Sequence, residues 1–101
     1  MIRGEIWRYA PVIHREGATN LRLVISAAAI NENPDFVVVL TLQIVNTDPG
    51  GLLAVCTEPY GWVSALAIEA TLKRRLTERV GSVDQTTMDQ VATALRAAQD
   101  L

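Results

Sequence analysis

The 101-residue chain has one cysteine, one histidine and no long apolar run. Because Cys56 has no second cysteine to pair with and ends the apolar run 52–56, we predict that it is a small core residue. So few soft ligands, with no carboxylate pair at ligand spacing, predict neither a metal site nor a cofactor. The longest apolar stretch, Phe36 to Leu40, is far shorter than the roughly 18 residues of a membrane span. We therefore expect no membrane role.

Other familiar signals are missing too. No apolar segment follows a basic start, so we expect no signal peptide and a cytoplasmic location. The net charge of −2 argues against a protein that coats nucleic acid by bulk electrostatics. Neither a Gly-x-x-x-x-Gly-Lys loop nor a Gly-x-Ser-x-Gly elbow occurs. These absences disfavour nucleotide triphosphate binding and serine hydrolase chemistry, and they leave a local basic site open.

What is present is an ordinary globular composition, half hydrophobic and one fifth charged. We expect a single domain over residues 1–101. A domain of this size buries only about two thirds of its unfolded surface, so a second subunit would stabilise it.

Short stretches rich in β-branched, aromatic and alternating residues predict a mostly β fold. The expected strands are Glu5–Tyr9, Leu21–Ser26, Phe36–Val45, Leu52–Thr57 and Trp62–Glu69. A period of two places Arg22 on the face of its strand that points away from the expected core. In the next strand it places Thr41 and Gln43 on the less apolar face. The opposite, wholly apolar row is Phe36, Val38, Leu40, Leu42 and Ile44.

The C-terminal third predicts helical structure. Thr71 is expected to cap a short helical turn over Lys73–Arg75, and Asp84 to cap an amphipathic helix that ends near Gln99. About five short strands followed by one helix predict a small closed or half-closed barrel, with the helix covering one end.

One polar set has a composition suited to chemistry on phosphate. Its members are His14, Arg15, Glu16, Arg22, Thr41 and Gln43. If the loop after the first strand folds over the next two, these side chains converge. A base and cationic donors are what metal-free phosphodiester cleavage needs. The alternative is that they are ordinary solvated loop and strand residues.

Several segments resemble the MazF/PemK toxin family, in the family's order. Arg3-Gly4-Glu5-Ile6-Trp7 is similar to its opening strand, and Leu23-Val24-Ile25-Ser26 to its Leu-Val-Val-Ser strand. Val37-Val38-Val39-Leu40-Thr41 resembles the strand that ends in the family's active-site threonine. Glu78-Arg79-Val80-Gly81 and the last helix resemble its C-terminal third.

The resemblance implies an SH3-like barrel, a homodimer, a cognate antitoxin, and metal-independent cleavage of single-stranded RNA to cyclic phosphate and 5'-hydroxyl ends. Glu16 falls within one residue of the family's loop acid, and Thr41 falls on the family's threonine, so the resemblance carries both roles over. Asn20 occupies the position of the family's arginine, so Arg22 or Arg15 is expected to supply the cation. His14, Arg15, Asn20 and Gln43 are the expected substrate-binding residues.

Two departures from the family keep other hypotheses open. The family's Asp-Gln-Ile-Arg stretch is replaced by Leu66-Ala67-Ile68-Glu69, and the loop between Val45 and Leu52 is short. A non-catalytic toxin that binds a protein target such as DNA gyrase is one alternative, and a degenerate toxin kept for antitoxin binding is another. A small barrel with no toxin role is a third reading.

Overall fold

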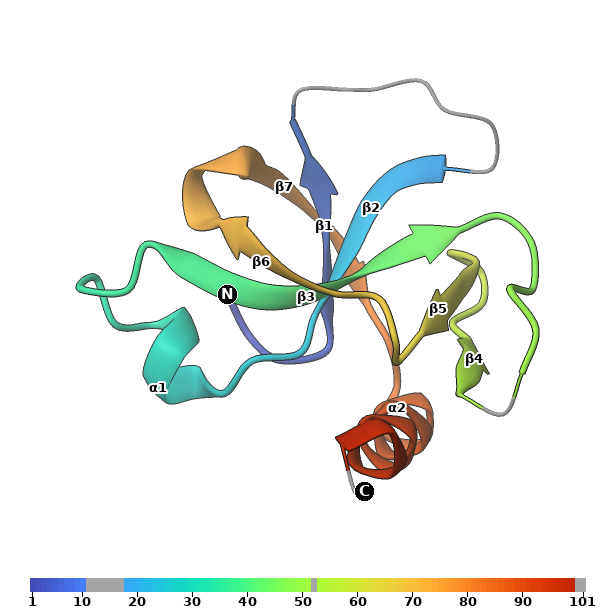
Figure 1. Cartoon of the computed structure of the whole chain (residues 1–101). Coiled ribbons are helices and arrows are strands. Elements are labelled where there is room, and N and C mark those ends of the chain that lie inside the picture. Colours follow the sequence, from blue (N-terminus) through green and yellow to red (C-terminus); the bar gives the residue numbers. More distant parts are fainter. Residues whose placement is uncertain (11–17, 52, 100–101) are drawn as a thin grey trace.

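The structure is a computed structural model that describes residues 1–10, 18–51 and 53–99. These residues form a curved sheet of seven antiparallel strands and a C-terminal helix (Figure 1). The elements are β1 Glu5–Tyr9, β2 Ala18–Val24, α1 Ala28–Asn31, β3 Val38–Val45, β4 Ala54–Cys56, β5 Trp62–Ser64, β6 Ile68–Leu72, the 3₁₀ turn η1 Lys73–Arg75, β7 Leu76–Ser82 and α2 Gln85–Gln99. The mostly β class with one C-terminal helix is confirmed, with seven strands rather than about five.

The strands pair in the order β4-β5-β3-β2-β1-β7, and β6 pairs with β3 beside β5. β3 is therefore the central strand and has neighbours along both edges. β4 and β7 lie at the two ends of this order, so the sheet curls into a half-closed barrel rather than a closed one.

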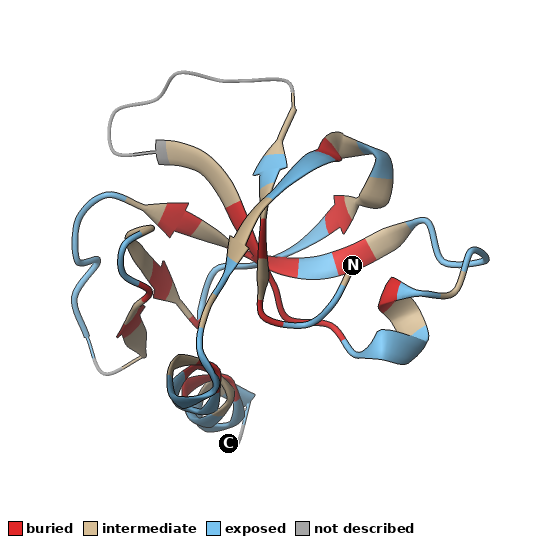
Figure 2. Ribbon diagram, turned by 180° about the vertical axis from the view of Figure 1, so that it is seen from behind, coloured by how far each residue is buried: buried red, intermediate tan, exposed pale blue. Residues whose placement is uncertain are grey.

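The main core lies between the outer face of the sheet and α2. Ile6, Leu23, Leu42 and Ile44 have no exposed surface there. The buried residues of α2 that pack against them are Met88, Val91, Ala94 and Leu95. In Figure 2 the buried residues gather at the middle of the sheet and on the side of α2 that faces it. Full burial of one such side chain contributes about 1.5–3 kcal/mol.

The start of α2 follows the sequence prediction. Asp84 lies just before the helix, and its carboxylate accepts a hydrogen bond of 2.7 Å from the backbone N–H of Thr87. This hydrogen bond, together with one from the Thr87 side chain, lowers the pKa of Asp84. The predicted N-cap is confirmed.

The concave face of the sheet, opposite α2, is also covered. Val24, Val39 and Leu76 are buried there and pack with Trp7 and Tyr9. Because the sheet curls over this face, the rule that one face of a strand faces water fails here.

Arg22 shows the same effect. It points away from the main core, as predicted, and it is nevertheless only 8% exposed because this second face is also covered. The expected apolar row on β3 is only half right. Leu42 and Ile44 are buried, whereas Phe36 and Leu40 are exposed and Thr41, on the other row, has no exposed surface.

Three further expectations are corrected. The predicted strand Trp62–Glu69 is divided by a turn into β5 and β6, and the amide of Ala67 donates to the carbonyl of Ser64 at 3.1 Å in that turn. Thr71 lies inside β6 and does not cap η1, which has no side-chain cap. Cys56 is partly exposed rather than part of the core.

Candidate functional site

Arg22 is the cation of the concave face. Its guanidinium carbon lies 4.5 Å from the centre of the Tyr9 ring, and its Nη1 donates to the carbonyl of Leu21 at 3.3 Å. Its side chain is 9% exposed. The Nε–H is buried and has no hydrogen-bond partner among the residues that the structure describes. A buried guanidinium in this state retains a directed donor for an oxyanion.

Glu69 supplies the negative charge that faces Arg22. Its carboxylate Oε2 lies 3.6 Å from the Nε of Arg22, close enough for an ion pair but outside hydrogen-bonding geometry. Glu69 lies on β6 directly opposite Thr41 of β3, so β3 passes between the strands of the two charged groups. Its side chain is 47% exposed, against 9% for that of Arg22.

Thr41 is the cross-strand neighbour of Glu69. It has no exposed surface, and its hydroxyl is 2.9 Å from the hydroxyl of Thr71. In this arrangement the Thr41 hydroxyl braces β3 against β6 and does not face solvent. Its predicted catalytic role stays a prediction.

Two other predicted residues lie near Arg22 in the sheet. Gln43 is the cross-strand neighbour of Arg22 and is half-buried on the same face. Asn20 has a φ of 59°, a left-handed conformation that asparagine tolerates better than most residues. It lies where the pairing of β2 with β3 is irregular, between Ala18 and Arg22. The structure thus places Arg22, Thr41 and Gln43 on one face, with Glu69 beside them.

The remaining predicted residues, His14, Arg15 and Glu16, lie outside the described residues. Their expected part in proton transfer and substrate binding therefore stays a prediction.

The segments Arg3–Trp7 and Glu78–Gly81, which resemble the family most specifically, contact each other. Their contacts stabilise the fold and do not belong to the site. Glu5 accepts hydrogen bonds from the Nε of Arg79 at 2.6 Å, the backbone N–H of Ile2 at 2.7 Å and the indole N–H of Trp7 at 3.3 Å. Burial raises the pKa of Glu5, but these hydrogen bonds and the charge of Arg79 outweigh it and hold the pKa below its ordinary value. The pair joins β1 to β7.

Lysine 73, the first residue of the basic run Lys73–Arg75, is also structural. The Nζ of Lys73 donates to the carbonyls of Ile30 and Asn33 at 2.8 and 2.9 Å. It ties η1 to the segment around α1, so this lysine is not a free phosphate ligand.

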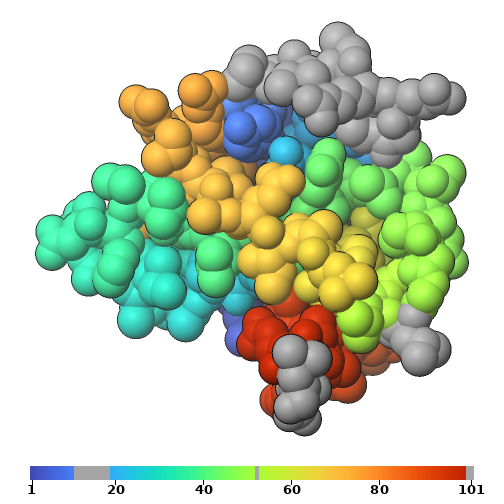
Figure 3. All heavy atoms as spheres, viewed as in Figure 1, coloured from blue at the N-terminus to red at the C-terminus, as the bar shows by residue number. Residues whose placement is uncertain are grey.

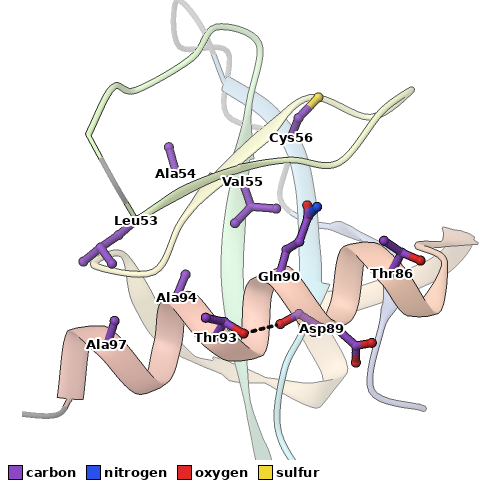
Figure 4. Close-up of a pocket in the computed structure, with 10 residues that line it drawn as sticks. All are labelled: Leu53, Ala54, Val55, Cys56, Thr86, Asp89, Gln90, Thr93, Ala94 and Ala97. Atoms are coloured by element: carbon purple, nitrogen blue, oxygen red, sulfur yellow. Dashed lines mark hydrogen bonds between the residues drawn. The ribbon is translucent and has the colours of Figure 1, made fainter.

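A separate hollow of about 650 Å³ lies between β4 and α2 (Figure 4). Its lining includes Val55, Cys56 and Ala94 and, on the rim, Asp89 and Gln90. None of the described residues that line it has a cationic side chain, and Asp89 adds a negative charge, which disfavours phosphate. The hollow is therefore poorly suited to RNA, whereas the concave face carries the buried arginine.

Sequence reasoning missed Tyr9 and Glu69 as parts of the site. The sequence places Tyr9 only in a strand, and it places Glu69 at the end of a strand and in the stretch that replaces the family's Asp-Gln-Ile-Arg. Parity gives only part of the signal, because Tyr9 lies two residues after Trp7 and shares its face of the strand. The rest comes from strand pairing, in which Trp7 pairs with Arg22 and Glu69 pairs with Thr41. Neither pairing is visible without the strand register.

Within the described residues no group of three or more histidine, cysteine, aspartate or glutamate side chains is arranged to hold a metal ion. No helix of the described chain has the length and apolarity that crossing a membrane requires.

Comparisons with solved structures reveal the same fold. An endoribonuclease from mycobacterial species superposes with a TM-score of 0.82 at 26% identity, over 100% of this chain and 92% of that one. An endoribonuclease in complex with its cognate antitoxin, also from mycobacterial species, gives 0.83 at 26%, over 100% and 96%. MazF from Deinococcus radiodurans, at 17% identity and a TM-score of 0.73 over 99% and 96%, shows the fold alone. No curated protein matches the chain significantly.

A family model agrees with these structures. The model of the PemK-like, MazF-like toxins of type II toxin-antitoxin systems matches residues 2–98. The resemblance noted at Arg3–Trp7 and at Glu78–Gly81 is thereby confirmed over nearly the whole chain. The chain belongs to the PemK-like, MazF-like family of type II toxins.

Proposed function

We propose that this chain is a toxin that cleaves single-stranded RNA as a metal-independent endoribonuclease. Family membership and the endoribonucleases of the same fold at 26% identity support the proposal. The observation that carries it is the buried guanidinium of Arg22, whose Nε–H has no hydrogen-bond partner among the described residues.

In the proposed reaction the ribose 2'-hydroxyl attacks the adjacent phosphorus. A base takes the 2'-hydroxyl proton, the bond from phosphorus to the 5'-oxygen breaks, and that oxygen receives a proton. The products are a 2',3'-cyclic phosphate and a 5'-hydroxyl end. No metal is needed, because a cationic donor stabilises the charge that develops on the phosphoryl oxygens.

Arg22 is the proposed donor, because an arginine held in place stabilises developing charge without reorganisation. Thr41 is proposed to support the scissile phosphate from β3, which requires its hydroxyl to be uncovered. Glu16 or His14 is proposed for proton transfer. Arg15, Asn20 and Gln43 are proposed to bind the flanking nucleotides.

A cognate antitoxin is the proposed protein partner. One of the mycobacterial endoribonucleases is in complex with its cognate antitoxin, and this chain is similar to that protein over its full length. An acidic, extended or helical segment that covers Arg22 would inhibit and stabilise the toxin together, by mass action. Toxin, antitoxin and RNA are proposed to meet in the cytoplasm.

We also propose a homodimer. Exposed apolar residues gather on the outer side of the paired strands β3 and β6 and in the turn before β6: Leu40 at 39%, Leu66 at 74% and Ile68 at 37% exposure. Figure 3 shows the β5–β6 segment on the surface just above α2. A second copy would cover this strip and enlarge a small core. Light scattering of the wild type should give a dimer mass, and Leu66→Asp a monomer mass.

RNA cleavage in EDTA tests the main proposal. Mixed single-stranded RNA is incubated with the wild type, Arg22→Ala, Thr41→Ala and the control Arg96→Ala, an arginine in the last turn of α2. We expect metal-free cuts with 5'-hydroxyl ends from the wild type and the control, and their loss in the other two. Intact RNA at high enzyme concentration, with every variant folded, would contradict the proposal.

The non-catalytic toxin is the second candidate function. Glu69 beside Arg22 and the full burial of Thr41 favour it, because both reduce access to the proposed donors. Capture of purified DNA gyrase without RNA cleavage would support it. Cleavage that disappears with Arg22→Ala would exclude it.

A further inference from the structure

The two partners of the ion pair between Arg22 and Glu69 differ in burial and in the number of contacts that hold them. The guanidinium is held by the ring of Tyr9 at 4.5 Å and by the carbonyl of Leu21 at 3.3 Å, and its side chain is 9% exposed. The carboxylate lies at 3.6 Å without a hydrogen bond to the guanidinium Nε, and its side chain is 47% exposed. The cation is therefore fixed, while the anion is exchangeable.

A buried charge needs a counter-charge, and Glu69 meets this need only in part. It neutralises Arg22 through space, but neither it nor any other described residue accepts a hydrogen bond from the Nε–H. An oxyanion with several acceptor oxygens would supply both the charge and the missing hydrogen bond. A phosphate group has that chemistry, and it would occupy the space where the carboxylate now lies.

We propose that Glu69 is an internal competitor for the phosphate site at Arg22: RNA must displace its carboxylate before a phosphodiester reaches the guanidinium. Glu69 is thus a positioning residue that sets how tightly the site binds phosphate. The inference rests on the proposed function for the identity of the ligand. The anion site itself rests on the geometry of the two side chains.

The decisive variant is Glu69→Gln, which keeps the shape of the side chain and removes its charge. The matched control is Glu78→Gln, because Glu78 forms an exposed ion pair with Arg8 at 3.7 Å on another strand. Both substitutions change the net charge by the same amount. Any effect of bulk charge on RNA binding will therefore appear in both variants.

The probe is a short single-stranded oligonucleotide with 2'-O-methyl riboses, which binds but cannot be cut through its 2'-oxygen. Fluorescence anisotropy should show about tenfold tighter binding to Glu69→Gln than to the wild type, and at most about twofold for Glu78→Gln. The gain should vanish in the double variant Arg22→Met/Glu69→Gln. Equal gains in both single variants, no gain, no binding by any form, or a gain that survives the loss of Arg22 would each overturn the proposal.

Inorganic phosphate alone provides a second readout that also detects misfolding. Glu69→Gln leaves Arg22 without a counter-charge, so its unfolding temperature should fall, and phosphate should restore more of it than it adds to the wild type. The two proposals fail separately. Cleavage by the wild type with no binding gain in Glu69→Gln sinks only the competitor role, whereas a gain that depends on Arg22 without cleavage by any form sinks only the ribonuclease.

Discussion

The two faces of the sheet differ in the polarity of the residues that they bury. On the outer face Ile6, Leu42 and Ile44 pack in an apolar cluster with the buried residues of α2. On the concave face a smaller apolar cluster shares its space with Arg22 and Thr41, both buried. The outer face gains free energy from apolar area alone, whereas the concave face carries a charge that costs desolvation.

The difference separates the face that contributes most apolar burial from the face that we propose binds a ligand. A buried ion pair is weak evidence for stability, because apolar residues of similar volume are often as stable or more so. Burial of the Arg22 guanidinium costs desolvation free energy, so binding of a ligand explains its position better than a gain in stability does. The following experiments test this division of roles, in order of decreasing expected effect.

Arg22→Met should separate activity from stability most strongly. Loss of the cation should lower the rate of RNA cleavage by about 10²- to 10³-fold, or about 3–4 kcal/mol in the barrier. The free energy of unfolding should change by no more than about 1 kcal/mol, since an apolar chain replaces a poorly bonded charge. Cleavage kinetics and urea denaturation measure the two quantities. A fall in the free energy of unfolding as large as the rise in the cleavage barrier would contradict this division of roles between the two faces.

Ile6→Ala should show the reverse pattern. Ile6 has no exposed surface and lies in the main core, so the substitution should lower the free energy of unfolding by about 3 kcal/mol. Below the unfolding transition, the cleavage rate per folded molecule should remain near that of the wild type. Urea denaturation and cleavage assays in parallel check this. A stability loss under about 1 kcal/mol would mean that the outer core is not the main source of stability.

Thr41→Val should have an intermediate effect on stability. The substitution leaves the buried Thr71 hydroxyl without the Thr41 oxygen at 2.9 Å, which should cost about 1–2 kcal/mol. The double variant Thr41→Val/Thr71→Val should recover most of this loss, because neither hydroxyl then lacks its partner. Thermal and urea denaturation of the wild type, Thr41→Val, Thr71→Val and the double variant measure the coupling. Additive losses would show that the two hydroxyls act independently.

Glu5→Gln should have the smallest effect, and one that depends on pH. The folded-state pKa of Glu5 is lowered, so its carboxylate stabilises the fold above the unfolded pKa of about 4.3, and this stability is lost as the pH falls through the folded value. At pH 7 the free energy of unfolding of the wild type should exceed that of Glu5→Gln. This difference should shrink as the pH falls and level off at a small constant value in acid. A difference independent of pH between 7 and 3 would contradict the ionic role of Glu5.

The sequence predicted several helices and strands correctly because neighbouring residues alone determine them. β1, the central part of β3, and α2 with its Asp84 cap follow from alternation, β-branching and capping chemistry, which neighbouring residues decide. The division of the predicted strand Trp62–Glu69 was not readable in the same way. Most of its residues are apolar, and the turn at Ala65–Ala67 depends on hydrogen bonds to Leu53 and Ser64.

The sequence by itself therefore determined the family, the mostly β class, and the strand faces on which Arg22 points away from the main core and Thr41 lies with Gln43. Only the tertiary structure decided that the face of Arg22 is enclosed, because curling of the sheet brings together strands far apart in sequence. It alone placed Glu69 beside Arg22 and Thr41 against Thr71. The physical reason is the strand register. The sequence of one strand shows which side chains share a face, but which side chains of different strands lie next to each other depends on how the strands pair.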